Sequence, residues 1–284
     1  HHHTGNTGHV RNGNYGLITV TTRTTFADDV RFRTTMVTGT LEANTITGNQ
    51  LIVDNGTVRC SGDVHVERIA GRGRIITDGS IICGGIELTG DLHSGGDVTC
   101  NDDLLVKGSL TSRHIRARNI LLHGVLQGHR INGSSLEIRP LRSAMFTRFD
   151  MLKYEGGSSA SHIDVNKIEA HRLTCRTLQA GTAILRDNSM VEHAICSTSI
   201  GLDRTSCVML VTENAEDIFE NRIKQIFRIT VHAFNGTVGR IDDVQPVLPR
   251  TGDDIGKGLL AQCRIVHNTM LAESLPTDFK LRLD

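Results

Sequence analysis

Two cysteines offer the most direct chemistry in this chain, because Cys83 and Cys100 stand 17 residues apart. Two thiols held side by side can be oxidised to a disulfide and act as a redox pair, whereas buried cysteines more commonly behave as small hydrophobic side chains. Both interpretations stay open, since the choice depends on whether the fold makes the two residues neighbours. The seven cysteines are odd in number and include no C-x-x-C pair, which is typical of a reducing cytoplasm rather than of a disulfide framework or a zinc site.

Residues suited to acid–base catalysis are scattered along the chain. Six histidines fall at turns or between the apolar positions: His65, His93, His114, His123, His129 and His171. Two tight acidic pairs lie in candidate regions, Asp102-Asp103 and Asp242-Asp243, and both are more typical of charged corners than of a catalytic dyad. We therefore predict a protein that is not an enzyme, with no catalytic residues, no cofactor and no metal site.

Glycine-rich and basic stretches give no clear ligand site either. Neither Gly71-Arg-Gly73 nor the segment 252–258 ends in the Lys-Ser/Thr of a phosphate loop, so we expect no bound nucleotide. Arg113, Arg116 and Arg118 form a small basic stripe. The stripe could contact an acidic partner or lipid, but a solvated face is the commoner interpretation.

The composition excludes several classes of partner. The 284 residues include 31 basic and 31 acidic side chains, so no strong attraction to nucleic acid or anionic lipid is expected. Aromatic residues make up 4%, with no Trp, which argues against stacking platforms for carbohydrate or single-stranded nucleic acid. The chain has no run of about 18 apolar residues and no signal peptide. Residues 1–14 are predicted to be disordered, with His1–His3 either a tag remnant or a native metal-binding tract.

A Gly-x-aliphatic triplet repeats six times, and it sets the architecture that must position all these residues. The triplets are Gly39-Thr-Leu41, Gly56-Thr-Val58, Gly73-Arg-Ile75, Gly90-Asp-Leu92, Gly108-Ser-Leu110 and Gly124-Val-Leu126, at steps of 17, 17, 17, 18 and 16 residues. Repeats of this length bury their apolar faces only against neighbouring repeats. The period therefore favours a scaffold over an enzyme.

Within each repeat, apolar residues alternate in pairs separated by five or six positions, which predicts three short strands joined by tight turns. Equivalent positions form columns of like side chains. One column is large (Leu41, Val58, Ile75, Leu92, Leu110, Leu126), one is small (Ala43, Cys60, Thr77, Ser94, Ser112, Gly128), and two more are aliphatic (Ile46, Val64, Ile81, Val98, Ile115, Ile131; Leu51, Ile69, Ile86, Leu104, Ile120, Leu136). Cys83 and Cys100 share another inward column. We predict a triangular β-helix of about 17 residues per turn with a dry aliphatic interior.

The predicted β-helix covers residues 15–211, with an insertion around 139–162 where the pattern weakens. A small α+β domain is expected from 212 to 284. Its helices are predicted to start at Asn214 and to span Gly258–Leu275, and its strand Ile229–Phe234 is followed by a turn at Asn235-Gly236.

The stacked pattern resembles the bactofilins, polymer-forming cytoskeletal proteins of bacteria. Two stretches carry the likeness: the array from Gly39 to Ile138, and the segment running from Val165-Asn-Lys-Ile168-Glu-Ala170 through Val191-Glu-His-Ala-Ile195 to Ile200-Gly-Leu202-Asp203. The resemblance implies a right-handed coil that assembles end to end into filaments without nucleotide. It also implies a cytoplasmic scaffold, often at the membrane, that serves cell shape, envelope synthesis or motility. The long C-terminal addition departs from the family and would limit assembly if it covered the last turn.

A β-helix also has two exposed strand edges that can template another chain. We predict a homopolymer whose end faces include Tyr15, Leu17, Phe26, Phe32, Ile200, Leu202 and Val208, with envelope or membrane-associated proteins as further partners. The alternative for the aromatic residues is that they plug the open end of the core. The alternative for the whole chain is a solenoid that does not polymerise, whose C-terminal domain recognises a partner. A left-handed acyltransferase helix fits less well, because the repeat departs from a strict hexapeptide.

Overall fold

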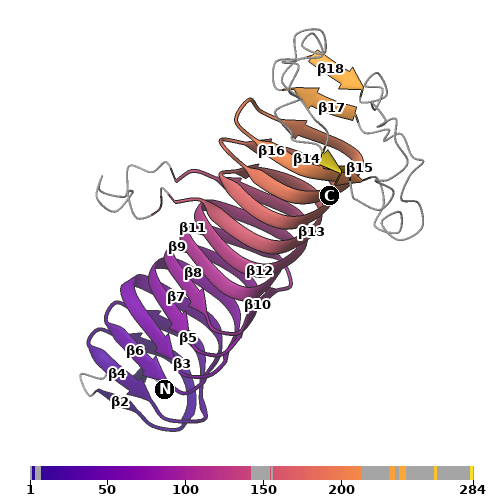
Figure 1. The fold of residues 1–284 in the computed structure, drawn as a ribbon. Coiled ribbons are helices and arrows are strands. Elements are labelled where there is room, and N and C mark those ends of the chain that lie inside the picture. Colours follow the sequence, from indigo (N-terminus) through magenta and orange to yellow (C-terminus); the bar gives the residue numbers. More distant parts are fainter. Residues whose placement is uncertain are drawn as a thin grey trace, which may run out of the picture. The chain divides into compact units, whose positions relative to one another are not determined.

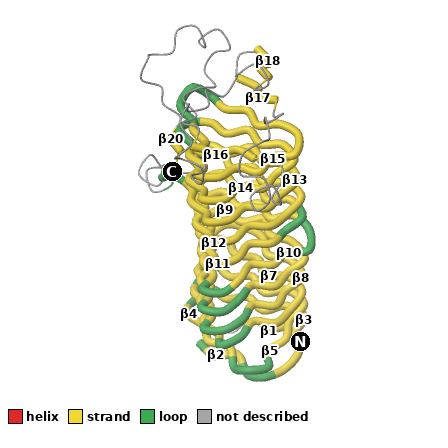
Figure 2. Tube along the Cα trace, turned by 45° about the vertical axis from the view of Figure 1, so that its right-hand side comes forward, coloured by secondary structure: helices red, strands yellow, loops and turns green. Residues whose placement is uncertain are grey.

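The computed structural model describes residues 8–141, 154 and 156–212, with the backbone of short strands at 2–3, 230–233, 237–240, 259–260 and 282–283 (Figure 1). The chain forms two compact units, residues 1–158 and 159–284. Parallel strands stack as a β-solenoid, with about 11 turns in all and roughly 17 residues per turn. Within the described part of the chain, strands and loops make up the fold (Figure 2), and no helix there has the length and apolar character needed to cross a membrane.

The unit of residues 1–158 contains twelve strands and the first residue of a thirteenth. They are β1 (His2–His3), β2 (His9–Val10), β3 (Gly13–Val20), β4 (Arg23–Phe26), β5 (Val30–Val37), β6 (Thr40–Ala43), β7 (Ile46–Cys60), β8 (Val64–Thr77), β9 (Ile81–Ser94), β10 (Asp97–Cys100), β11 (Asp103–Arg116) and β12 (Asn119–Arg139), with β13 (Ser158–His171) beginning at the boundary. Figure 1 shows them stacked turn upon turn. Every pairing in the series from β7 to β12 is parallel.

The register confirms the predicted columns. Leu41 pairs with Val58, and the same column continues through Ile75, Leu92, Leu110 and Leu126. Each of these six side chains is at most 1% exposed. Each turn places its large residues against those of the neighbouring turns. Stacking therefore buries apolar side chains that a single 17-residue turn would leave exposed.

The repeated glycine is explained by the corner that it occupies. Gly73, Gly90, Gly108 and Gly124 are register partners in successive turns, and all four have positive φ values between 134° and 147°. A Cβ built on Gly90 would lie 2.0 Å from the carbonyl oxygen of Gly73. The corner therefore needs glycine both for its backbone conformation and for its close stacking.

The interior is less uniformly aliphatic than the sequence predicts, because the small column forms a polar ladder. The buried hydroxyl of Ser94 donates to the carbonyl oxygen of Gly79 at 2.8 Å, and that of Ser112 donates to Gly96 at 3.0 Å. Thr77 donates in the same way to Gly62. Each side chain thus satisfies a corner carbonyl of the turn before it, which a purely apolar residue could not do.

The unit of residues 159–284 continues β13 and adds seven strands. They are β14 (Leu173–Arg186), β15 (Met190–Leu202), β16 (Cys207–Thr212), β17 (Thr230–Ala233), β18 (Thr237–Arg240), β19 (Leu259–Leu260) and β20 (Arg282–Leu283). β14, β15 and β16 pair in parallel. Their corner uses Asp187 and Asn188, with φ values of 53° and 63°, in place of stacked glycines, because short polar residues tolerate this conformation. The backbone N–H groups of both residues donate to side chains of the next turn, Asp203 and Thr205.

Two sequence predictions need correction here. Residues 1–14 were predicted to be disordered, but strand β2 and the start of β3 lie in that range, because buried Val10 is the register partner of Phe26. A helix was predicted over residues 258–275, but residues 259–260 at its start form strand β19, which pairs antiparallel with β20. The rest of that helix and the helix at Asn214 lie outside the described residues. The strand predicted at 229–234 is confirmed by β17 (Thr230–Ala233), which pairs antiparallel with β18, and the turn predicted at 235–236 lies outside the described residues.

Candidate self-association ends

The N-terminal end of the first unit presents backbone hydrogen-bonding groups away from the stack. The N–H of Gly13 and the C=O of Val10 both bond the following turn. Successive residues of a strand direct these groups to opposite edges, so those of Asn14 and His9 point outward. Both residues are exposed. Such an edge can accept a strand from another chain.

Phe26 and Phe32 lie one turn inside this end rather than on it. Each is 3% exposed, and their rings meet edge to face with centroids 6.3 Å apart. Phe32 also fills the space above Gly48, where a Cβ would lie 2.3 Å from the ring. These contacts correspond to the interpretation in which aromatic residues plug the core, because buried rings present no surface to a second chain.

Tyr15 and Leu17 are half-buried. Tyr15 is the register partner of Phe32, and its hydroxyl donates to the carbonyl oxygen of Arg11 at 2.9 Å. Leu17 pairs with Thr34 in an outward column, while buried Ile18 takes the inward position. Strand β1 pairs in parallel with β3 at Leu17 and Ile18, so the edge of β3 is covered there. Tyr15 therefore lies on the stretch of this edge that has no outer paired strand within the described residues.

The C-terminal end of the second unit has one open side and one covered side. The N–H of Cys207 donates to the C=O of Ser189 at 2.8 Å, so the alternating backbone groups of Val208 and Leu210 point away from β15. Strand β17 pairs with residues 199–202 of β15 and is itself paired antiparallel with β18. The β17–β18 hairpin thus covers one side of the last turn. On its other side β16 pairs with no further strand within the described residues, although β19 lies close to it.

The three residues predicted for this face are buried. Ile200, Leu202 and Val208 are 1%, 2% and 0% exposed. Their side chains fill the interior of the last turn, so a contact at this end would involve the backbone edge of β16 rather than these side chains. The sequence predicted exposed strand edges at both ends but not which backbone groups form them, because a backbone N–H gives no signal in residue type.

A polar corner holds the last turn in place. One oxygen of the Asp203 carboxylate accepts the N–H of Asp187 at 2.7 Å, and the other accepts the N–H and hydroxyl of Thr205 at 3.1 Å. Burial by itself raises the pKa of Asp203, but these bonds and one from Ser206 outweigh it and hold the pKa below its usual value.

The residues considered for catalysis are engaged in bridges between turns. Asp102 pairs with Arg118 at 3.2 Å, and Asp103 accepts the side-chain amide of Asn119 at 2.8 Å. His114 pairs with Asp97 at 3.1 Å. These contacts agree with the charged-corner interpretation for the first acidic pair. The second pair, 242–243, lies outside the described residues, and the described histidine, cysteine and carboxylate side chains form no group of three that could hold a metal ion.

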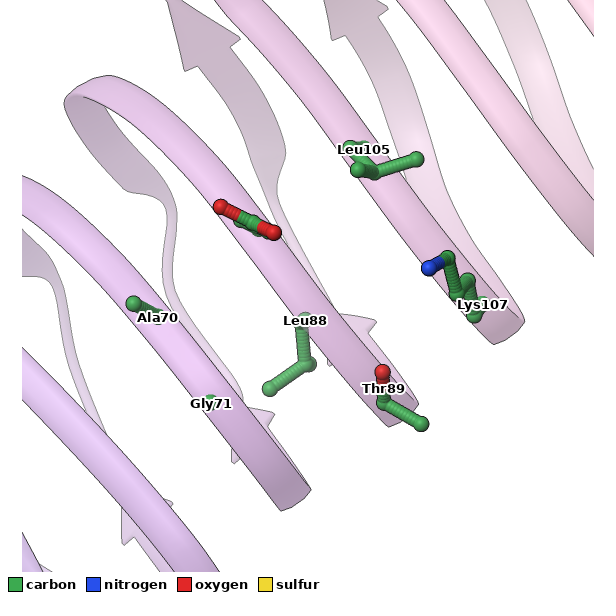
Figure 3. A pocket seen from close by; sticks show the side chains of 7 residues that line it. Ala70, Gly71, Leu88, Thr89, Leu105 and Lys107 are labelled. Carbon is green, nitrogen blue, oxygen red and sulfur yellow. The ribbon is translucent and has the colours of Figure 1, made fainter. Parts of the chain in front are cut away.

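A hollow of about 280 Å³ opens on the outer surface between β8, β9 and β11 (Figure 3). It exists because Ala70 and Gly71 are small where the preceding turn has Ile52 and Val53. Its ionisable lining groups are Glu87 and Lys107. Since the Glu87 carboxylate is paired with Arg68 at 3.4 Å, this hollow shows no arrangement suited to catalysis.

Cys83 and Cys100 are brought together as predicted. They are register partners on β9 and β10, and each is 3% exposed.

Comparison of the chain with family models, with curated proteins and with solved structures gives no match.

Proposed function

We propose that this chain is a bactofilin-like scaffold without enzyme activity, a right-handed triangular β-helix that self-assembles end to end without nucleotide. The observation that carries the proposal is two stretches of strand edge that pair with no further strand within the described residues. His9 and Asn14 direct backbone groups outward at the N-terminal end, and Val208 and Leu210 do so on β16. Joining such edges from two copies would satisfy donors and acceptors on both and continue the parallel ladder.

Assembly of this kind would be restrained at the C-terminal end. The β17–β18 hairpin occupies the side of the last turn next to residues 199–202, and the antiparallel strand β18 cannot continue a parallel ladder there. We propose that the hairpin acts as a partial cap. A cytoplasmic location, and partners at the membrane or envelope, belong to the same proposal and rest on the family resemblance.

The β17–β18 hairpin also favours a second candidate function. If it blocks assembly completely, the chain is a solenoid that does not polymerise and the hairpin is available to recognise a partner. The two candidates differ in one measurable property, which is association of the purified chain with itself.

The edge contact can be tested with Asn14→Pro, which removes the outward N–H without touching the bonds between β3 and β5. Proline is tolerated on edge strands. Loss of one hydrogen bond of about 1 to 1.5 kcal/mol should weaken self-association roughly five- to tenfold, measured by sedimentation velocity. Asn14→Ala keeps the N–H and is the matched control. Equal association of the two variants, with unchanged circular dichroism, would count against the edge contact.

A further inference from the structure

The two cysteines inside the first unit meet the geometric needs of a disulfide. Their Sγ atoms are 3.0 Å apart. Disulfides need Cα atoms about 4.4–6.8 Å apart, and neighbouring strands of a sheet lie about 4.8 Å apart. Because Cys83 and Cys100 are register partners on parallel strands, they can be joined by side-chain rotation alone.

The surroundings leave these thiols no other sulfur with which to pair. Val66 lies next to Cys83 in the same column. Cys60, another buried cysteine of this unit, lies in the small column between Ala43 and Thr77. Its thiol donates to the carbonyl oxygen of Asn44 at 3.3 Å. The register therefore singles out one pair among the cysteines of residues 8–141.

We propose that Cys83 and Cys100 are an oxidation site, where an intramolecular disulfide joins β9 to β10 and closes one turn covalently. The oxidant class is a small disulfide such as glutathione disulfide. One cysteine sulfur attacks it and releases one glutathione, and the second cysteine sulfur then attacks the mixed disulfide and releases the other. Two cysteine S–H bonds and one S–S bond break, one S–S bond forms, and the two protons end on the released glutathione thiols.

The bond forms while the chain folds rather than after it has folded. The hydrogen bond from Cys83 and the burial both raise the pKa of the Cys100 thiol well above its ordinary value, and the folded structure covers both sulfurs. The reactive thiolate is therefore scarce and inaccessible in the native state. The site is independent of end-to-end assembly, because both side chains lie inside the solenoid.

The test refolds the full-length chain with reduced and oxidised glutathione and maps its peptides after thiol alkylation. Wild type and the Cys60→Ala control should yield one linked peptide pair containing Cys83 and Cys100, with the loss of two hydrogen atoms and a raised denaturant midpoint. Cys83→Ala and Cys100→Ala should give no such link, and alanine is tolerated inward, as at buried Ala43.

Two results would overturn the proposal. One is a refolded chain with the native β-sheet spectrum in which both thiols are alkylated. The other is a link from either cysteine to a different partner. If the folded, reduced chain is oxidised as fast as the refolding chain, the assignment of the reaction to the folding stage is wrong.

Discussion

At the scale of single residues, Thr35 places a hydroxyl where the column is otherwise aliphatic. It lies between Ile18 and Leu51 in the register, it is 0% exposed, and its hydroxyl oxygen has no hydrogen-bond partner in the described structure. A buried hydroxyl without a partner costs about 1–3 kcal/mol.

The Thr35→Val substitution should therefore stabilise the protein by roughly 1–3 kcal/mol, because it removes that hydroxyl and keeps the shape of the side chain. Urea unfolding followed by circular dichroism measures the change. Thr47→Val, at an exposed position of β7, controls for strand propensity and should have little effect. A destabilised Thr35→Val variant would mean that the hydroxyl has a partner.

Histidine protonation links stability to pH near the last turn. Burial lowers the pKa of His193 below its ordinary value of 6.5, and its Nε2 atom lies 3.1 Å from the hydroxyl of Thr212. The unfolded chain therefore binds the proton first as the pH falls below 6.5. The stability contributed by neutral His193 is fully present above pH 6.5 and is lost as the pH falls from there toward the lowered pKa.

We expect the free energy of unfolding to fall between about pH 7 and pH 5, and to fall less in His193→Gln, which cannot take up the proton. Urea midpoints across this range test the expectation. His123, whose pKa is lowered by burial and by Lys107, adds a similar contribution, so its own Gln variant completes the set. Identical pH profiles for wild type and both variants would contradict the linkage.

At the scale of the elements, the corner glycines set the stacking distance. The Gly90→Ala change puts a Cβ against the Gly73 carbonyl oxygen at 2.0 Å and strains a φ of 134°. We expect a loss of about 2–5 kcal/mol of stability, measured by urea unfolding. Gly85→Ala is the matched control, because its nearest contact would be at 3.4 Å. Equal stability of the two variants would show that the corner can relax.

The sequence predicts those parts of the fold that repeat. Columns such as Leu41–Val58–Ile75 and the glycine corners of the first unit recur in successive turns, so periodicity reveals them. Features that occur once give no such signal. The inward position of Ile18 in place of Leu17 follows a change of phase within β3, and the fit of Phe32 over Gly48 needs coordinates. The open edges at Asn14 and Val208 are backbone properties, which residue types do not encode.

At the scale of the whole molecule, the proposed function requires that copies of this chain join end to end through strand edges. The β17–β18 hairpin bears directly on it, because it covers part of the last turn. A chain ending at Thr212 keeps all of β16 and lacks the hairpin, so it should assemble more readily than the full-length chain.

The most direct measurement is negative-stain electron microscopy of the purified full-length chain beside the chain ending at Thr212. We expect filaments from the shortened chain and fewer or shorter ones from the full-length chain, with both reduced by Asn14→Pro and unchanged by Asn14→Ala. Failure of both chains to form filaments at every salt concentration would contradict end-to-end assembly and favour a solenoid that binds a partner.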